Sequence, residues 1–134
     1  MTTKLIPRTT KDIAKAASSL CFGQIFSFNS ALKLYHWYVT GKGSYSQHMA
    51  LDAAVDSLLK ATDSLVETTI SMHGDIEIVI PETCIPDDII KYTKDFYAYM
   101  ETQRELFSEA FTQSIIDDYQ ETVQRLLYKL QRLQ

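Results

Sequence analysis

The stretch LYHWYVTGKGSYSQH, residues 34–48, holds two of the three histidines of the chain on either side of a short glycine turn. Gly41 and Gly43 interrupt two long stretches with helical periodicity, so we expect the chain to reverse here from one helix into the next. The reversal brings His36, near the end of the first helix, close to His48, near the start of the second. Residues beyond the hairpin decide whether these imidazoles are packing residues or ligands.

Upstream of the turn, the sequence predicts a first helix that is capped by Thr10 and runs to about Tyr38. Its apolar positions include Ile13, Ala17, Leu20, Leu32 and Tyr35.

Downstream, a second helix is predicted to begin at Ser44 or Ser46, because Ser44 and Gln47 match a capping box. It should end near Met72, where His73 and Gly74 form a typical stop. The face that we assign to the core carries Leu51, Ala54, Leu58, Ala61, Leu65 and Met72.

Residues 75–86, DIEIVIPETCIP, favour a short irregular or extended connection. Pro86 followed by two aspartates suits the start of a third helix, which we expect to reach about Ala110. A fourth helix, capped by Thr112 or Ser114, carries a long apolar seam with three-four spacing. The seam consists of Ile116, Tyr119, Val123, Leu126, Leu130 and Leu133. Residues 1–134 therefore predict one all-α domain, a four-helix bundle.

Composition narrows the classes of partner. The net charge of −4 and the thin basic segments at both ends disfavour DNA binding. No apolar run approaches the roughly 20 residues that span a bilayer. The first residues lack the apolar centre of a signal peptide, and Cys21 and Cys84 form neither a CxxC pair nor a disulfide framework. We therefore expect a cytoplasmic protein with reduced thiols.

The second helix also carries a stripe of groups that can bind metals. His48, Asp52, Asp63 and Glu67 fall within a sector of roughly 100° at about 100° per residue, and Asp56 lies in the same sector. A solvated acidic face would explain the carboxylates equally well. His36 favours the metal reading, because the turn places it near His48 and Asp52. Two imidazoles and a carboxylate suit iron, zinc or manganese.

Asp63 lies roughly 16 Å along the helix from Asp52, too far to share a metal within one chain. The spacing is nevertheless symmetric, because the pair 48 and 67 and the pair 52 and 63 share one midpoint. If two copies of this helix cross antiparallel near that midpoint, His48 approaches Glu67 of the second copy and Asp52 approaches its Asp63. We therefore predict a site shared across a two-fold interface.

The motif YHWYVTGKGSYSQH resembles the helix-turn-helix signature of the Dps-like mini-ferritins, in which a His-Trp pair precedes a turn of this length and a second histidine. The later acidic residues also fall at the spacing of that family. Carried over by position, His36, His48 and Asp52 match the ligands from one subunit, and Asp63 and Glu67 match those from its two-fold neighbour. Trp37 matches the tryptophan beside the iron site.

The resemblance implies a ferritin-like four-helix bundle that assembles into a hollow homo-oligomer, typically a dodecamer. Such proteins oxidise Fe(II) with peroxide or oxygen at inter-subunit ferroxidase sites and store the ferric mineral inside. Asp117, Asp118 and Glu121 would line an iron-entry pore, although a solvated first helical turn explains them equally well.

Two other functions fit the sequence. A ferritin-like structural or assembly protein would keep the bundle and the dimer without ferroxidase activity. A metal-binding module could hold zinc or manganese instead of iron, since the ligand set does not specify its metal.

Overall fold

The computed structural model describes residues 10–133 and places them in four α-helices. The helices are α1 (Thr10–Tyr38), α2 (Ser44–His73), α3 (Ile89–Gln103) and α4 (Ala110–Arg132), and a 3₁₀ turn, η1 (Arg104–Leu106), follows α3. The predicted all-α four-helix bundle is confirmed, and residues 10–133 contain no strand. None of the helices in this range has the length and apolarity needed to cross a bilayer.

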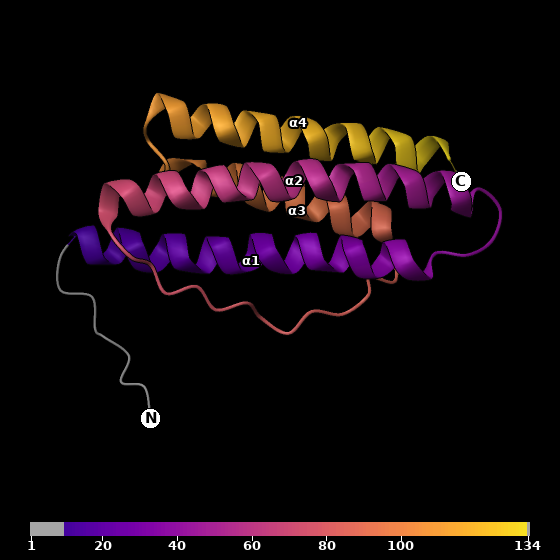
Figure 1. The fold of residues 1–134 in the computed structure, drawn as a ribbon, viewed down its shortest axis with the longest axis horizontal. Helices are drawn as coiled ribbons and strands as arrows, with labels where there is room; N and C mark the ends of the chain where they lie inside the picture. The colour runs from indigo at the N-terminus through magenta and orange to yellow at the C-terminus, as the bar shows by residue number, and fades with distance from the viewer. Residues whose placement is uncertain (1–9, 134) are drawn as a thin grey trace.

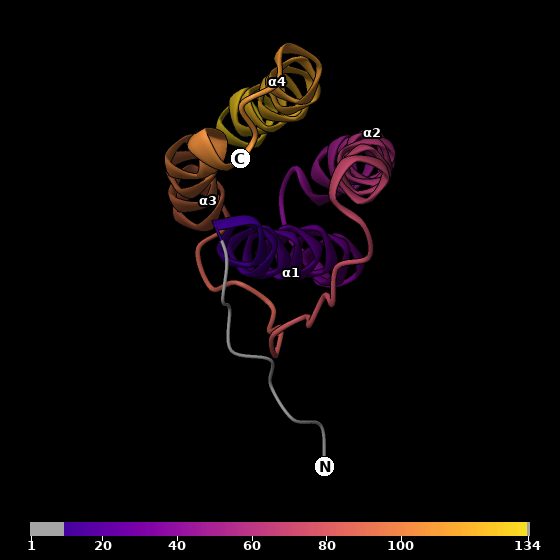
Figure 2. The same ribbon diagram turned by 90° about the vertical axis from the view of Figure 1, so that its left-hand side faces the viewer.

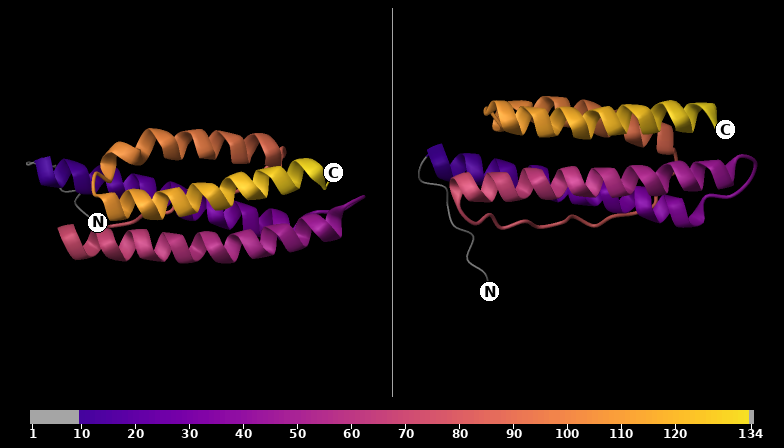
Figure 3. Two further views of the ribbon diagram at one scale, coloured as in Figure 1. Left: turned by 90° about the horizontal axis from the view of Figure 1, so that it is seen from above. Right: turned by 45° about the horizontal axis from the view of Figure 1, so that its top comes forward.

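Neighbouring helices in the bundle run antiparallel, but the chain order is unusual (Figure 1). α1 and α4 run in one direction, and α2 and α3 run in the other. α4 packs most extensively on α2, α1 packs on α2, and α3 packs on α4. The end view and the view from above show α2 and α3 on opposite corners of the bundle (Figures 2 and 3). The connection between them must therefore return along the bundle.

Residues 74–88 make this return in an extended conformation along the outer side of α1 (Figure 1). Fifteen residues reach at most about 50 Å, whereas the 30 residues of α2 are about 45 Å long. The segment must return along much of this length, which accounts for its extended backbone. Ile76 and Ile78 pack against the core, whereas Val79 and Ile80 remain 69% and 51% exposed.

Three small residues on α1, spaced four apart, hold this connection. The Ser19 hydroxyl donates to the Glu77 carbonyl, and the Ser27 and Thr83 hydroxyls lie 2.9 Å apart within hydrogen-bond distance. Between them, a Cβ added to Gly23 would lie 2.3 Å from the Val79 carbonyl oxygen. We call Ser19, Gly23 and Ser27 the crossover seat. A glycine at its centre lets the two backbones approach this closely.

The buried face of α1 differs from the prediction at two positions. Leu32 is fully buried, but Ile13 is 60% and Leu20 is 72% exposed. The core side of α1 is set by Phe22 and Phe28, whose rings pack on the other half of the bundle. Phe28 stacks on Phe96 of α3 with ring centroids 4.0 Å apart. This orientation turns Ile13 and Leu20 away from the core.

The predicted apolar faces of α2 and α4 are largely confirmed. On α2, Leu51, Ala54, Leu58 and Leu65 are buried, whereas Ala61 and Met72 are half-buried. On α4, five of the six predicted positions are buried and Leu133 is half-buried.

A buried polar network joins three helices inside this core. The Tyr119 hydroxyl on α4 donates to Asn29 Oδ1 at 2.9 Å, and Asn29 Nδ2 on α1 donates to Thr62 Oγ1 at 3.1 Å. Thr62 in turn donates to the Leu58 carbonyl of its own helix. All three side chains are at least 95% buried. The network fixes the register of α1, α2 and α4 because each polar group needs its partner.

The predicted capping box at the start of α2 is wrong. Gly43 is the N-cap, and its φ of 79° is favourable for glycine. The buried Gln47 side chain donates to the Leu133 carbonyl at the end of α4, so it is not available to the α2 terminus. The predicted stop is correct, since α2 ends at His73 and Gly74 has a φ of 86°.

The predicted boundary between the third and fourth helices is also wrong. α3 is capped by Asp88, which accepts from the Lys91 amide, but it ends at Gln103. α4 then begins at Ala110, before the predicted caps Thr112 and Ser114. The corner is closed by tertiary contacts: Gln113 donates to the carbonyls of Arg104 and Phe107. Phe107 is buried beside Phe22, which turns the chain into the core.

The crossover seat predicts that Gly23→Ala destabilises the protein. Alanine normally stabilises a helix interior by about 0.5–1 kcal/mol relative to glycine, but here its methyl group would displace the Val79 carbonyl. We expect a loss of about 1–3 kcal/mol in the free energy of unfolding, measured by urea denaturation. Gln24→Ala, at the exposed neighbouring position, is the control and should change stability little. A gain in stability from Gly23→Ala would contradict the need for glycine at the centre of the crossover seat.

The buried network predicts that Tyr119→Phe lowers the free energy of unfolding by about 1–3 kcal/mol, because Asn29 Oδ1 loses its donor. Thermal and urea unfolding would measure the change. Tyr128→Phe, at a position 57% exposed, is the matched control and should be nearly neutral. Equal effects from the two variants would refute a structural role for the network.

Candidate metal centre

The α1–α2 hairpin places the two histidines in direct contact. The rings of His36 and His48 stack with centroids 3.8 Å apart and an angle of 22° between their planes. His36 lies in the last turn of α1, and His48 lies in the second turn of α2. Gly41 and Gly43 have φ values of 92° and 79°, which confirms that these glycines make the turn.

His36 is the buried member of the pair. Its residue is 5% exposed, and neither ring nitrogen has a hydrogen-bond partner. Burial lowers the pKa of His36, the charges of His48 and Lys33 lower it further, and Asp52 opposes this shift. The imidazole is therefore neutral at physiological pH, the form in which it can bind a metal. A buried ring with two unpaired nitrogens is rare in a native protein.

His48 is held by the backbone of α1. Its Nδ1 lies 2.9 Å from the carbonyl oxygen of His36, one of the last four carbonyls of that helix. A carbonyl only accepts, so Nδ1 carries the hydrogen and Nε2 keeps a free lone pair when the ring is neutral. Metal-bound histidines commonly make this second contact to a carbonyl. The same bond also closes the end of α1, so it has a structural use as well.

Asp52 brings a carboxylate to the two rings. Its Oδ1 lies 3.5 Å from His36 Nε2 and accepts a hydrogen bond from Lys33 Nζ at 3.1 Å. The hydrogen bond and charge of Lys33 lower the pKa of Asp52, and the nearby histidines lower it less. The carboxylate is therefore ionised at neutral pH. His36, His48 and Asp52 thus lie together, as the sequence predicted.

Asp63 and Glu67 lie further along α2 and do not join this group. Both are exposed, and Asp63 is roughly 16 Å along the helix from Asp52. Within residues 10–133 of a single chain, no three His, Cys, Asp or Glu residues are arranged to hold a metal ion. Completion of the site by a second copy of the chain stays a prediction.

Lys33 is the residue at this site that the sequence reasoning missed. It lies one turn before His36 and Trp37, so its position relative to the hairpin was readable. Which acid it pairs with depends on how α1 packs against α2, and the sequence pattern does not specify that rotation.

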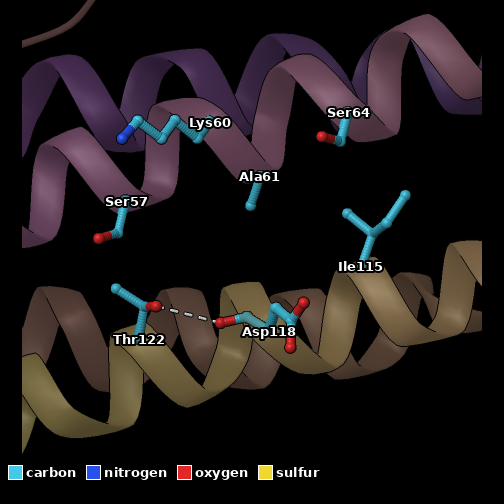
Figure 4. A pocket seen from close by; sticks show the side chains of 7 residues that line it. All are labelled: Ser57, Lys60, Ala61, Ser64, Ile115, Asp118 and Thr122. Atoms are coloured by element: carbon cyan, nitrogen blue, oxygen red, sulfur yellow. Dashed lines mark hydrogen bonds between the residues drawn. The ribbon is translucent and has the colours of Figure 1, made fainter.

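The three acidic residues predicted to line a pore do not converge within one chain. Asp117 pairs with Arg104, and Glu121 pairs with Arg125. Asp118 lies beside a shallow hollow between α2 and α4, where Figure 4 shows it near Thr122. The alternative explanation as a first helical turn is wrong, because α4 begins at Ala110 and has no acidic residue in its first turn. A pore between subunits stays a prediction.

The hollow itself is not a second candidate centre. It is lined from α2 by Ser57, Lys60, Ala61 and Ser64 and from α4 by Ile115, Asp118 and Thr122 (Figure 4). Asp118 is the one carboxylate among them, and no histidine or cysteine is present. The histidines at the hairpin end of the bundle therefore remain the candidate site.

Residues 36–130 match the model of a family of unknown function, DUF5856. The match covers most of the chain, which therefore belongs to this family, and it includes all five candidate ligands. No curated protein and no solved structure matches the chain.

Because the His36 ring is buried with unpaired nitrogens, we expect it to lower the stability of the metal-free protein. His36→Leu replaces two unpaired buried nitrogens by carbon, so we expect the free energy of unfolding of the metal-free protein to rise by about 1 kcal/mol. Chemical denaturation in the presence of a chelator measures this. His73→Leu, in the last turn of the same hairpin's second helix, is the control and should give no gain. A marked loss of stability from His36→Leu would identify the ring as an ordinary packing residue.

Proposed function

We propose that this chain of the DUF5856 family is a mini-ferritin that oxidises Fe(II) and stores the ferric product. The single observation that carries the proposal is the contact between the stacked His36 and His48 rings and the Asp52 carboxylate at the hairpin end of the bundle. Fe(II) is the substrate of this site. Asp63 and Glu67 of a second copy complete it.

The chemistry of the three groups supports metal binding. His36 is neutral and buried, and its ring nitrogens have no protein partner. His48 donates its Nδ1 hydrogen to a backbone carbonyl, which leaves Nε2 for a metal. Asp52 supplies an ionised oxygen, and carboxylate ligands favour Fe(III) over Fe(II). His36 is therefore neutral and Asp52 ionised, the forms in which these groups bind iron.

The exposed face of α2 supports an antiparallel second copy. The ligand positions are symmetric about the middle of the helix, so two such helices that cross there exchange their ends. Leu59 lies next to this midpoint and is 45% exposed, and Met49 is 50% exposed on the same side of the helix. Burying these side chains against a partner stabilises the pair and brings Asp63 and Glu67 to the histidines.

The connectivity of the bundle supports the ferritin-like assignment. Residues 74–88 form one long crossover between two parallel helices, and this single crossover is the arrangement of ferritin-like bundles. Assembly of the two-fold pairs into a hollow shell, typically of twelve subunits, would retain the mineral.

Oxidation needs an acceptor for the electrons of iron. Two Fe(II) ions give one electron each to a hydrogen peroxide molecule, whose O–O bond breaks and which takes up two protons to become two water molecules. Oxygen is the alternative acceptor.

The two cysteines are free thiols, with Cys21 buried and its pKa raised to about 12 by burial. Free thiols are typical of a reducing compartment, and we place the protein in the cytoplasm.

A structural or assembly protein without ferroxidase activity is the second candidate. Two observations favour it: Lys33 already pairs with Asp52, and the His48 bond to the His36 carbonyl stabilises the end of α1. In this case the hairpin would hold the fold and bind no iron.

Iron oxidation separates the two functions. Purified protein mixed with Fe(II) and peroxide should develop ferric absorbance faster than buffer alone and retain iron in a large particle on size exclusion. Asp63→Ala with Glu67→Ala should abolish the protein-dependent rate while helicity, measured by circular dichroism, stays constant. Asp56→Ala, an exposed acid on the same stripe, is the matched control and should keep the rate.

Two results would contradict the proposal. Wild-type protein that gives the buffer rate and elutes without iron favours the structural function. A double variant that keeps the wild-type rate refutes the shared site. Binding of Zn(II) or Mn(II) without iron oxidation would identify a metal-binding module.

A further inference from the structure

We propose that Lys33 occupies Asp52 until a divalent metal displaces it, and that the displaced ammonium moves closer to the Trp37 ring, over which it already lies. The inference rests on the proposed function, since it assumes that Asp52 is a metal ligand. It adds a residue outside the five candidate ligands and a signal for occupancy of the site.

The geometry places a cation on Asp52 already. Lys33 Nζ lies 3.1 Å from Asp52 Oδ1, and the same oxygen lies 3.5 Å from His36 Nε2. A metal that binds both His36 and Asp52 needs this oxygen. Two cations that crowd around one carboxylate oxygen repel each other, so metal binding requires the ammonium to move away.

Lys33 has a second contact that it can keep when a metal takes Asp52. Its Nζ lies 5.8 Å from the centroid of the Trp37 ring, one helical turn further along α1. Trp37 is 60% exposed, so its ring face is open to a cation. The side chain of Lys33 is 35% exposed and has a flexible four-carbon stem. A cation over an indole ring is stabilised by the ring's quadrupole.

Exchange of one cation for another has two consequences. Without metal, the ammonium holds the Asp52 carboxylate beside His36. With metal, the loss of the Lys33–Asp52 pair makes the net free energy of metal binding less favourable. Removal of Lys33 should therefore tighten metal binding, whereas removal of a supporting residue would weaken it.

The test uses Zn(II), which binds histidine and carboxylate ligands but does not change oxidation state. Trp37 is the one tryptophan in the sequence, so its fluorescence reports on this position alone. We expect a saturable fluorescence change in the wild-type protein and a Zn(II) affinity measurable by calorimetry. Lys33→Met should bind Zn(II) about two- to five-fold more tightly, the range that an exposed ion pair gives. Its fluorescence change should be largely lost.

Control variants separate the effect of the Lys33–Asp52 contact from the effect of any positive charge on the hairpin. Lys42→Met removes an exposed positive charge from the same hairpin, and it should leave both affinity and fluorescence change at wild-type values. Lys33→Arg retains the charge and should keep the weaker affinity. If Lys33→Met folds poorly, Lys33→Gln gives the same comparison.

The outcomes distinguish this inference from the proposed function. Zn(II) binding that is lost in Asp52→Ala but is unchanged or weakened in Lys33→Met overturns the role of Lys33 and leaves the metal site intact. Absence of Zn(II) binding by the wild-type protein overturns both. Tighter binding by Lys33→Met with a reduced Trp37 response supports the exchange.

Discussion

The close approach of residues 74–88 to α1 is the constraint on which the arrangement of the bundle depends. α2 and α3 run parallel, so the chain must return along much of the bundle between them. Gly23 leaves room for the Val79 carbonyl, and Ser19 and Ser27 bind the segment on either side. With the crossover in place, α3 can start at the hairpin end and pack its aromatic face on Phe28.

At the hairpin end of the bundle, the features that would suit metal binding differ in their effect on the stability of the fold. His36 is buried with both ring nitrogens unpaired, which costs free energy that a leucine would not cost. Such a group is favoured where something other than the fold uses it, and a metal that binds the ring would offset the cost. The His48 bond to the α1 backbone works differently, because it benefits the fold and prepares the ring at the same time. The two histidines therefore have different relations to stability.

Electrostatic contacts also connect the residues at the hairpin end of the bundle. Lys33, His36 and Asp52 form a short chain of contacts in which the lysine neutralises the carboxylate that the buried ring cannot neutralise. The pKa of Asp52 is lowered mainly by Lys33, and the pKa of His36 is lowered mainly by burial. One group is thus held charged and the other neutral within a few ångströms. This combination suits ligands that must receive a divalent cation without a change in protonation.

The sequence by itself determined the number and order of the helices, the turn at Gly41 and Gly43, and the proximity of His36, His48 and Asp52. These features are local: helical periodicity, glycine conformations and a reversal of a few residues fix them. Tertiary structure alone decided that Gln113 and Phe107 close the α3–α4 corner, that Gly23 receives the crossover, and that Lys33 pairs with Asp52. Each of these depends on the rotation of one helix against another, and that rotation is set by packing of side chains distant in the sequence.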